Sequence, residues 1–577
     1  MKNLYSKLCA ILLIIPFIYS CKPISVKPLE PEQIRMEGEL RARIEKNFDR
    51  LEEEKYQPGN VFLTDAQSGG WPGDTEGRTI LGLIKDARAS GRSPLYLQEI
   101  IDLIPSHLNK KGYMGTIYPG KMNEQQLSGN GWMLRALCEY YAWKNDPKTL
   151  TLINTIADSL FVTGKGYYAR YPIDPQKRIQ GKGVESGNTI QSEGEWMLST
   201  DIGCLFIGMD GAIQAYKYHR TPQLKAVIEE MIERFLEIDL IGIRAQTHAT
   251  LTACRGLIRY AEITGRDSYI QEAEKRWKLY LSDGMTENFE NYNWFDRFET
   301  WSEPCAIVDS YLLAVQLWQH TGNPSYKEMA EYIYYNALSH TQRWNGGFGC
   351  DNCPGKVSGN SLRVHADEAH WCCTMRGGEG LGSAANFACF QRSRTLLIPF
   401  YQSCVFEATI GEGTVNITEE SSYPSEGKVS FFFTSNTAGN ITLKLSAPSW
   451  TKKHQLFFNN EYIPCQVNNG FITLTHDFVT DDKIELLFDQ KFTISGGLNK
   501  QNTDSSQVRI FYGPLLLGYE GKEELQIDPK DIIERLEDGT FQIKGKNTPL
   551  SPVYHFMDRK VWSDSGYQKQ ILFRRKR

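Results

Sequence analysis

After its first twenty residues, this 577-residue sequence has no apolar run long enough to cross a membrane. It also lacks a stripe of lysine and arginine and any aromatic nucleic-acid motif, and its formal net charge is only -5 at pH 7. We therefore expect the mature chain to be a soluble body that does not bind nucleic acid.

The first twenty residues have the layout of a secretory signal peptide, with a positively charged start and an apolar run too short to span a bilayer. Ser20 precedes Cys21, and a small residue before a cysteine is typical of bacterial lipoproteins, in which that cysteine carries the lipid. We predict a signal peptide over 1–20, a lipid anchor at Cys21, a tether over 21–38, and export to the periplasm or outer membrane. Ordinary cleavage nearby is the alternative.

The period of the hydrophobic pattern divides the rest of the chain in two. Over 39–395 the period is helical, and a helical hairpin with a polar break recurs, as in "YKYHRTPQLKAVIEEMIERFL". The breaks are unequally spaced, which favours a closed α/α barrel with a central cavity over a solenoid. A period of two follows, as in "NITLKLSAPSW", and predicts an antiparallel β-sandwich over 396–500 and a smaller C-terminal β domain over 501–577.

Two cysteines, Cys372 and Cys373, stand side by side in "EAHWCCTMRGGEGLG". Neighbouring cysteines rarely bond to each other, because disulfide geometry needs separated backbones with converging Cβ atoms. Their partners must therefore lie elsewhere in the fold. The candidates are separate disulfides, a shared metal ion, or a reactive thiol beside a supporting one.

Partners of suitable chemistry occur upstream in "TWSEPCAIVDSYLLAVQLW", where an apolar helix is predicted to begin. Ser302 fits the N-cap and Pro304 the first turn, so the carboxylate and thiol beside them lie at a helix N-terminus, which favours negative charge. One carboxylate and three thiols suit tetrahedral zinc: Glu303, Cys305, Cys372 and Cys373. In the alternative, Cys305 is a core residue and the tandem cysteines have unrelated roles.

A second cysteine motif, "CDNC", has a spacing found in metal and redox sites. A zinc ribbon would need a further cysteine pair at similar spacing, and the sequence contains none. Cys350 and Cys353 therefore stand as a second candidate for a metal ion or a disulfide.

Three motifs together resemble glycoside hydrolase family 127, the group typified by β-L-arabinofuranosidases: "TENF", "EPC" and "WCC". The segments "QTHATLTACRGLIRYAEITG", "APSW" and "FYGPLLLGYE" extend the resemblance over most of the chain. It implies an (α/α)6 barrel followed by antiparallel β-sandwich domains. It also implies zinc bound by Glu303, Cys305, Cys372 and Cys373, with Cys372 as nucleophile, Glu287 as acid/base and net retention of configuration.

A zinc-free alternative would use Glu287 and Glu303 as the pair of carboxylates found in most retaining glycosidases. This alternative gives no role to Cys305, Cys372 and Cys373.

The chain departs from the family around the sugar. Asn130 stands where a family histidine is expected, a second family histidine has no match, and Thr374 and Met375 follow the tandem cysteines where prolines are common. We expect bond cleavage to be kept and the glycone to differ. Candidate substrate contacts are His248, Asn130 and Arg376, the last toward an acidic sugar group, with a surface salt bridge as its alternative.

The resulting hypothesis is an exported, retaining exo-glycoside hydrolase. Its substrate would be a furanoside, either β-L-arabinofuranoside-like or a modified sugar of a plant-cell-wall oligosaccharide. The rival hypotheses are a non-catalytic glycan-binding lipoprotein and a polysaccharide lyase on the same barrel.

Overall fold

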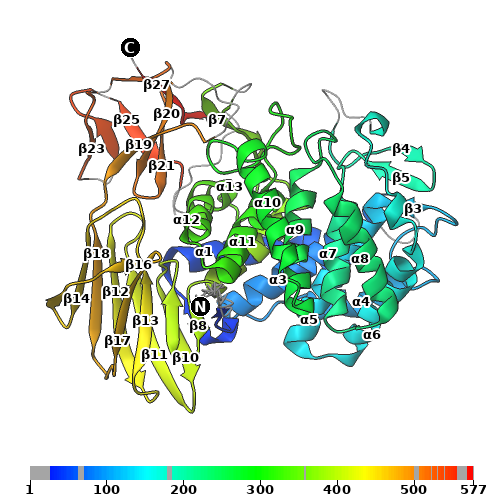
Figure 1. The fold of residues 1–577 in the computed structure, drawn as a ribbon, viewed down its shortest axis with the longest axis horizontal. Helices are drawn as coiled ribbons and strands as arrows, with labels where there is room; N and C mark the ends of the chain where they lie inside the picture. Colours follow the sequence, from blue (N-terminus) through cyan, green and yellow to red (C-terminus); the bar gives the residue numbers. More distant parts are fainter. Residues whose placement is uncertain are drawn as a thin grey trace, which may run out of the picture.

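The computed structural model describes residues 26–62, 70–178, 185–355, 359–498, 506–521, 523–528, 530–537, 540–546, 548–554 and 568–575. The predicted signal peptide and Cys21 lie outside these residues. Helices fill one part of the molecule and β-sheets another (Figure 1), so the fold is mixed α and β. Within the described residues, no helix combines the length and the apolar character needed to pass through a bilayer.

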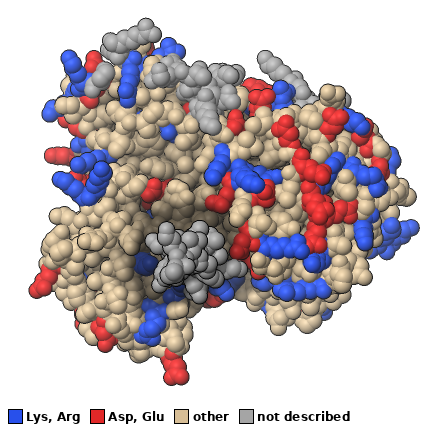
Figure 2. Space-filling model, viewed as in Figure 1, with Lys and Arg blue, Asp and Glu red and all other residues tan. Residues whose placement is uncertain are grey.

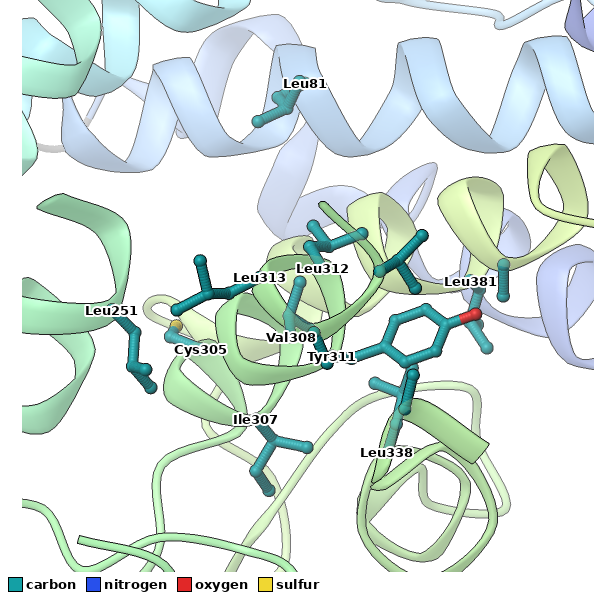
Figure 3. Packing of buried hydrophobic residues seen from close by; sticks show 14 of the residues in the cluster. Leu81, Leu251, Cys305, Ile307, Val308, Tyr311, Leu312, Leu313, Leu338 and Leu381 are labelled. Carbon is teal, nitrogen blue, oxygen red and sulfur yellow. The ribbon is translucent and has the colours of Figure 1, made fainter. Parts of the chain in front are cut away.

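Six helices form an inner set: α3 (Asp74–Ser90), α5 (Glu124–Lys144), α7 (Leu205–Tyr216), α9 (Thr247–Thr264), α11 (Pro304–Thr321) and α14 (Cys373–Asn386). They pack in a closed order, each on the next, and α14 returns to α3. On α11, Ile307, Tyr311 and Leu312 point to different sides, Leu312 toward Leu81 and Tyr311 toward Leu338 and Leu381 (Figure 3), and all of them are buried. A helix with apolar residues on several sides is stabilised by burial on several sides, which explains its place inside the set.

An outer set packs behind the inner helices: α1 (Gly38–Leu51), α4 (Leu97–His107), α6 (Pro147–Ile156), α8 (Pro222–Leu236), α10 (Ser268–Asp283) and α12 (Pro324–Ile333). The polar breaks predicted within the helical hairpins contain the N-terminal caps of three of these outer helices. Asp146, Thr221 and Asn323 cap α6, α8 and α12 with their side chains, and each helix has proline in its first turn. Two short helices, α2 (Pro58–Val61) and α13 (Ser339–Thr341), complete the α-helices of the described residues.

Glycines set the spacing between α5 and α7. A Cβ at Gly131 would lie 2.5 Å from Cα of Gly208, and a Cβ at Gly211 would lie 2.4 Å from the carbonyl oxygen of Gly131. The two backbones are therefore in direct contact, and no side chain fits between them.

We expect Gly211→Ala to lower the free energy of unfolding by about 1–3 kcal/mol, because the added methyl group forces the two helices apart. Urea unfolding followed by tryptophan fluorescence measures the change. Gly59→Ala in α2 is the control, since a Cβ there meets nothing within 4 Å. An equal decrease in the free energy of unfolding in both variants would show that the close contact between α5 and α7 does not make Gly211 more sensitive to substitution.

Two sheets follow the helical part, one with strand order β1-β8-β9-β13-β17-β16 and one with order β15-β14-β18-β12-β11-β10-β2. The first contains β1 (Lys27–Pro28), β8 (Phe390–Arg392), β9 (Thr395–Ile398), β13 (Ile441–Ser446), β17 (Phe471–His476) and β16 (Val467–Asn468). The second contains β15 (Glu461–Ile463), β14 (His454–Phe458), β18 (Lys483–Phe488), β12 (Lys428–Asn436), β11 (Gly413–Ser421), β10 (Cys404–Ile410) and β2 (Ile34–Met36). Alternate residues of β10 are buried, as the period of two requires.

The remaining strands form two further sheets. A small one joins β3 (Met122–Asn123), β5 (Trp196–Ser199) and β4 (Thr189–Glu193). A large C-terminal one contains β22 (Gln526–Ile527), β27 (Phe573–Arg575), β20 (Gln507–Tyr512), β21 (Leu515–Tyr519), β25 (Pro549–Pro552), β24 (Phe541–Ile543), β23 (Ile533–Arg535), β19 (Phe492–Gly496), β26 (Gln568–Gln570), β7 (Ser361–Ala366) and β6 (Cys350–Asn352).

Two segments depart from the domain boundaries expected from sequence. The end of the expected tether forms β1 and β2, which pair with β8 and β10. Strands β6 and β7 come from the helical half but join the C-terminal sheet, because β7 pairs with β26. Strands β6 and β7 are short and lie between helices, so the local hydrophobic pattern does not indicate the distant strand with which β7 pairs.

On the face drawn in Figure 2, basic side chains are scattered in separate groups, and acidic side chains gather in a run over the helical part on the right. That face therefore offers no continuous positive field to a polyanion.

Candidate active site

A cavity of about 600 Å³ lies at the N-terminal ends of several inner helices. Its lining includes Asp74 and Arg78 of α3, His248 of α9, Glu303 at the start of α11 and Cys372 at the start of α14. Helix N-termini carry partial positive charge, so carboxylates and thiolates gathered there are stabilised.

The structure brings the four predicted metal ligands together. One ligand atom from each of Glu303, Cys305, Cys372 and Cys373 lies within 4.8 Å of the others. The Sγ of Cys373 is 3.6 Å from that of Cys305 and 3.2 Å from that of Cys372. Cys372 is half-buried, whereas Cys305 and Cys373 are fully buried. Glu303 is itself the N-cap of α11, one residue after the predicted Ser302.

This arrangement fits zinc. In a tetrahedral site with Zn–S bonds of about 2.3 Å, neighbouring sulfurs lie about 3.8 Å apart. The sulfur–sulfur distances of 3.2 and 3.6 Å are close to that value. The cluster contains thiols and a carboxylate, the donor types that zinc accepts.

Side chains around Glu303 fix its orientation. Nδ1 of His248 lies 3.2 Å from Glu303 Oε1, and its Nε2 lies 3.3 Å from Asp309 Oδ2. Gln246 donates from Nε2 to Glu303 Oε2 at 3.3 Å. Burial alone would lower the pKa of His248, but the neighbouring carboxylates outweigh it and raise the pKa to about 9. Such partners hold a metal ligand in one rotamer.

Arg78 places a positive charge beside the thiols. Its Nη1 donates to Cys305 Sγ at 3.1 Å, while Nε and Nη2 donate to the two oxygens of Asp74 at 2.6 and 3.0 Å. Burial opposes ionisation of Cys305, but hydrogen bonds from Cys372 and Cys373 and the charge of Arg78 outweigh it. The pKa of the Cys305 thiol is therefore held well below its usual value.

Asn130, expected to contact the sugar, is fully buried and absent from the cavity lining. Its side chain accepts from the N–H of Met114 at 3.0 Å and donates to the carbonyl oxygens of Met114 and Gln126 at 3.1 and 3.0 Å. This expectation is corrected: Asn130 holds the loop before α5 against that helix, because all its polar atoms are used by backbone groups.

Arg376, expected at an acidic sugar group or in a surface salt bridge, is also fully buried. Its Nη2 lies 2.7 Å from Asp309 Oδ1, and it pairs with Glu379. Because Arg376 lies about one turn beyond Cys373 on α14, and Asp309 about one turn beyond Cys305 on α11, both belong to an ionic layer beneath the four ligands. The expectation of a substrate contact is corrected for this residue as well.

Glu287, expected as the acid/base, lies outside the cavity lining and is fully buried. Its Oε2 accepts from the backbone N–H of Leu498 at 2.6 Å and lies 3.6 Å from Nε of Arg509. The chain turns back sharply here, with Phe289 at φ 68° and a bridge between Met285 and Asn291. This turn directs Glu287 toward the β part of the molecule. Its role as the group that protonates the leaving oxygen stays a prediction.

The "CDNC" cysteines point to different neighbours. Cys350 lines the cavity, whereas Sγ of Cys353 lies 3.4 Å from Glu290 Oε2. All eleven cysteines in the described part of the chain are free. A second buried group of possible ligands, Glu290, His340 and Asp351, contains neither cysteine, and Arg343 already neutralises Asp351 at 2.8 Å.

Sequence reasoning missed four charged residues of the cavity, Asp74, Arg78, Glu185 and Asp201. Asp74 and Arg78 could have been found from the sequence, because an acidic and a basic residue four positions apart at a helix start pair on one face of the helix. No local sequence pattern identifies Asp201, because its partners Ser186 and Gly187 lie in another segment.

Comparisons with known proteins point to one family. A family model described as "Beta-L-arabinofuranosidase, GH127 catalytic domain" matches residues 236–386, and one described as "Beta-L-arabinofuranosidase, GH127 middle domain" matches residues 395–490. The first match contains all four clustered ligands. No curated protein matches the chain significantly.

Solved structures share the fold. A GH127 beta-arabinofuranosidase has a TM-score of 0.69 at 14% identity, covering 96% of this chain and 98% of its own. A GH127 beta-L-arabinofuranosidase from Geobacillus stearothermophilus T6 has a TM-score of 0.69 at 13% identity, covering 94% of this chain and 100% of its own. The likeness therefore extends over both the helical and the β parts.

Proposed function

Because this chain belongs to glycoside hydrolase family 127, we propose that it is a retaining exo-glycosidase that cleaves a furanoside with Cys372 as nucleophile. The position of Cys372 supports this proposal most. It is the most exposed of the three clustered thiols and lines the 600 Å³ cavity. A sugar bound there would meet a thiol at the start of α14.

We assign the helical part to an (α/α)6 barrel over 39–395, followed by a β-sandwich over 396–500 and a smaller β domain over 501–577. The closed packing order of the six inner helices supports the barrel, as do the outer helices packed behind them. In such a barrel the helix starts at one mouth surround a common cavity, which is where the predicted ligands lie.

Glu303, Cys305, Cys372 and Cys373 would hold the zinc ion, which stabilises a cysteine ligand as thiolate at neutral pH. Cys372 Sγ attacks the anomeric carbon, the bond to the leaving oxygen breaks, and a thioglycosyl intermediate of inverted configuration forms. Water then attacks the same carbon and Cys372 departs as thiolate. Two inversions give net retention. A separate group must supply a proton to the leaving oxygen in the first step and take one from the attacking water in the second.

Aromatic side chains line the cavity, and their rings can stack on the apolar faces of a sugar. Trp301 stacks on His365 with ring centroids 4.7 Å apart, and Trp371 is 52% exposed beside the nucleophile. Gln246 and His248 offer polar atoms between these walls. We propose a furanose of a plant-cell-wall oligosaccharide as glycone, either β-L-arabinofuranose or a modified relative.

We further propose that the protein is exported and held by a lipid on Cys21, in the periplasm or at the outer membrane. The proposal depends on the N-terminal sequence alone, whose apolar run ends in Ser20 and Cys21. Metabolic labelling with a fatty-acid analogue, compared between the wild type and Cys21→Ser, tests it. An equally labelled variant would exclude this anchor.

Metal analysis tests the ligand set. We expect about one zinc per chain in protein purified under reducing conditions, as one tetrahedral site holds. Cys305→Ser should lower zinc affinity at least about tenfold, because it removes a buried thiolate ligand. Cys465→Ser is the control, since Cys465 lies in the β-sandwich and donates to a backbone carbonyl of His454. Active protein without metal would contradict the site.

A panel of plant-cell-wall oligosaccharides separates hydrolysis from glycan binding. The proposed activity releases one monosaccharide from the non-reducing end, identified by mass. Binding of an oligosaccharide without any released sugar would support the glycan-binding alternative.

A further inference from the structure

We propose that Trp371 is the platform for the sugar on the leaving side of the cleaved bond, an inference that rests on the proposed function above. The indole stacks on the apolar face of that second sugar. The enzyme therefore selects a furanose attached to another sugar over a simple alkyl furanoside.

The cavity has a buried end and an exposed end. Gln246, His248 and Glu303 lie at the buried end, where 3, 1 and 9% of their surfaces are exposed. Trp371 lines the same cavity and is 52% exposed, and Cys372 is half-buried between these extremes. A glycone that reaches the polar atoms of the buried end lies inward of the nucleophile. The group attached to that glycone then leads outward past Trp371.

The size of the cavity suits more than one sugar. Cavities of about 300–1,000 Å³ enclose drug-sized ligands, which are larger than a single pentose. The cavity here has a volume of about 600 Å³. A furanose at its buried end therefore leaves room for part of a second sugar at the mouth.

Trp371 differs from the other two tryptophans of the cavity. Trp71 and Trp301 are half-buried, Nε1 of Trp71 donates to a backbone carbonyl oxygen at 3.3 Å, and Trp301 stacks on His365. Trp371 makes a T-shaped contact with His370, with ring centroids 5.0 Å apart and ring planes at 82°. More than half of its surface is open to a ligand at the mouth, where a sugar can stack on it.

The segment that carries Trp371 is held against α1 and the turn that follows this helix. The two carboxylate oxygens of Glu368 accept from Arg50 at 3.0 and 2.9 Å. The hydroxyl of Tyr56 donates to the carbonyl oxygen of His370 at 3.1 Å. A tryptophan on a fixed backbone has two side-chain torsions to lose on binding, so it offers a large contact area at a low entropic cost.

Trp371 acts on affinity and not on bond cleavage. It directly precedes the nucleophile, so its Cα lies about 3.8 Å from that of Cys372, and its ring is within reach of the group that leaves. It forms no bond to the sugar and moves no proton. Because the stacked sugar is held in the bound substrate as well as in the transition state, losing the contact should raise KM more than it lowers kcat.

Kinetics of Trp371→Ala with two substrates that release the same sugar test the assignment. The substrates are β-L-arabinofuranobiose and methyl β-L-arabinofuranoside, and released L-arabinose is measured for both. With the disaccharide, kcat/KM should fall about 10–100-fold, mainly through KM, because the contact with the leaving sugar is lost. With the methyl furanoside, kcat/KM should change less than about threefold, since its leaving group has no ring to stack.

Matched variants show that the effect belongs to this ring. Trp371→Phe keeps a flat aromatic side chain and should recover most of the activity on the disaccharide. Trp344→Ala is the control, because Trp344 is 46% exposed but lies outside the cavity lining. It should leave both activities unchanged. The inhibition constant of L-arabinose should stay the same in Trp371→Ala, because the buried end of the cavity is intact.

The outcomes separate the platform from the proposed function. Equal losses on the two substrates, or an unchanged kcat/KM with the disaccharide, would overturn the role of Trp371 while leaving Cys372 as nucleophile. Failure of the wild type to release L-arabinose from either substrate would instead overturn the proposed arabinofuranosidase, and this inference with it.

Discussion

Cys372→Ala should lower kcat by about 10⁴-fold or more, the size of loss seen when an enzyme nucleophile is removed. The loss should be equally severe with an acidic phenol as leaving group, because the missing atom is the one that bonds to the sugar. Mass spectrometry of the intact variant, mixed with 2,4-dinitrophenyl β-L-arabinofuranoside, should detect no glycosyl adduct. Proton NMR of the wild-type product should show retained configuration.

The matched control for this experiment is Cys465→Ala. Cys465 is half-buried like Cys372, but it lies in the β-sandwich, where its thiol donates to a backbone carbonyl. It should keep wild-type activity. An adduct on Glu303, or an active Cys372→Ala enzyme that still retains configuration, would transfer the role of nucleophile to a carboxylate.

The largest loss of stability is expected for Asp309→Asn. Asp309 is fully buried, and it accepts from Thr252 Oγ1 at 2.6 Å and from Arg376 Nη2 at 2.7 Å and also pairs with Arg255. These arginines hold the pKa of its carboxyl well below the usual value against the effect of burial. Removing the negative charge leaves cations buried without their counter-ion, which costs about 3–5 kcal/mol.

Urea unfolding at pH 7 measures this cost. Asp158→Asn is the control, because Asp158 is 52% exposed and pairs with His219 at 2.9 Å across the surface. Its loss should stay below about 1 kcal/mol. Similar values for the two variants would mean that the ionic layer beneath the ligands contributes little to folding.

The sequence predicted those features that depend on short segments. The change of hydrophobic period marks the boundary between helices and strands, and proline with a polar cap marks the outer helix starts. The ligand set was also accessible, because two local motifs at helix starts supply all four residues. The structure gathers Glu303 and Cys305 of one helix start with Cys372 and Cys373 of another.

Features that depend on distant contacts were not predicted. Asn130 and Arg376 are on inner helices, but sequence does not tell whether an inward side chain faces the cavity or lies one turn deeper. Glu287 precedes the ligand motif closely, yet one turn at Phe289 with φ 68° sends it toward Arg509. Asp201 gains its environment from Ser186 and Glu303, which no local pattern links to it.

The pairing of β7 with β26 makes the cavity depend on a segment far away in the sequence. His365 and Ala366 of β7 line the cavity, but the partner strand of β7 is Gln568–Gln570, in which Gln568 lies 207 residues after Ser361 in the chain. Contacts so distant in sequence form late in folding. Chains truncated before residue 568 should therefore keep all four predicted ligands but lack the support for one wall of the cavity, so the distant C-terminal sheet is needed to shape the site.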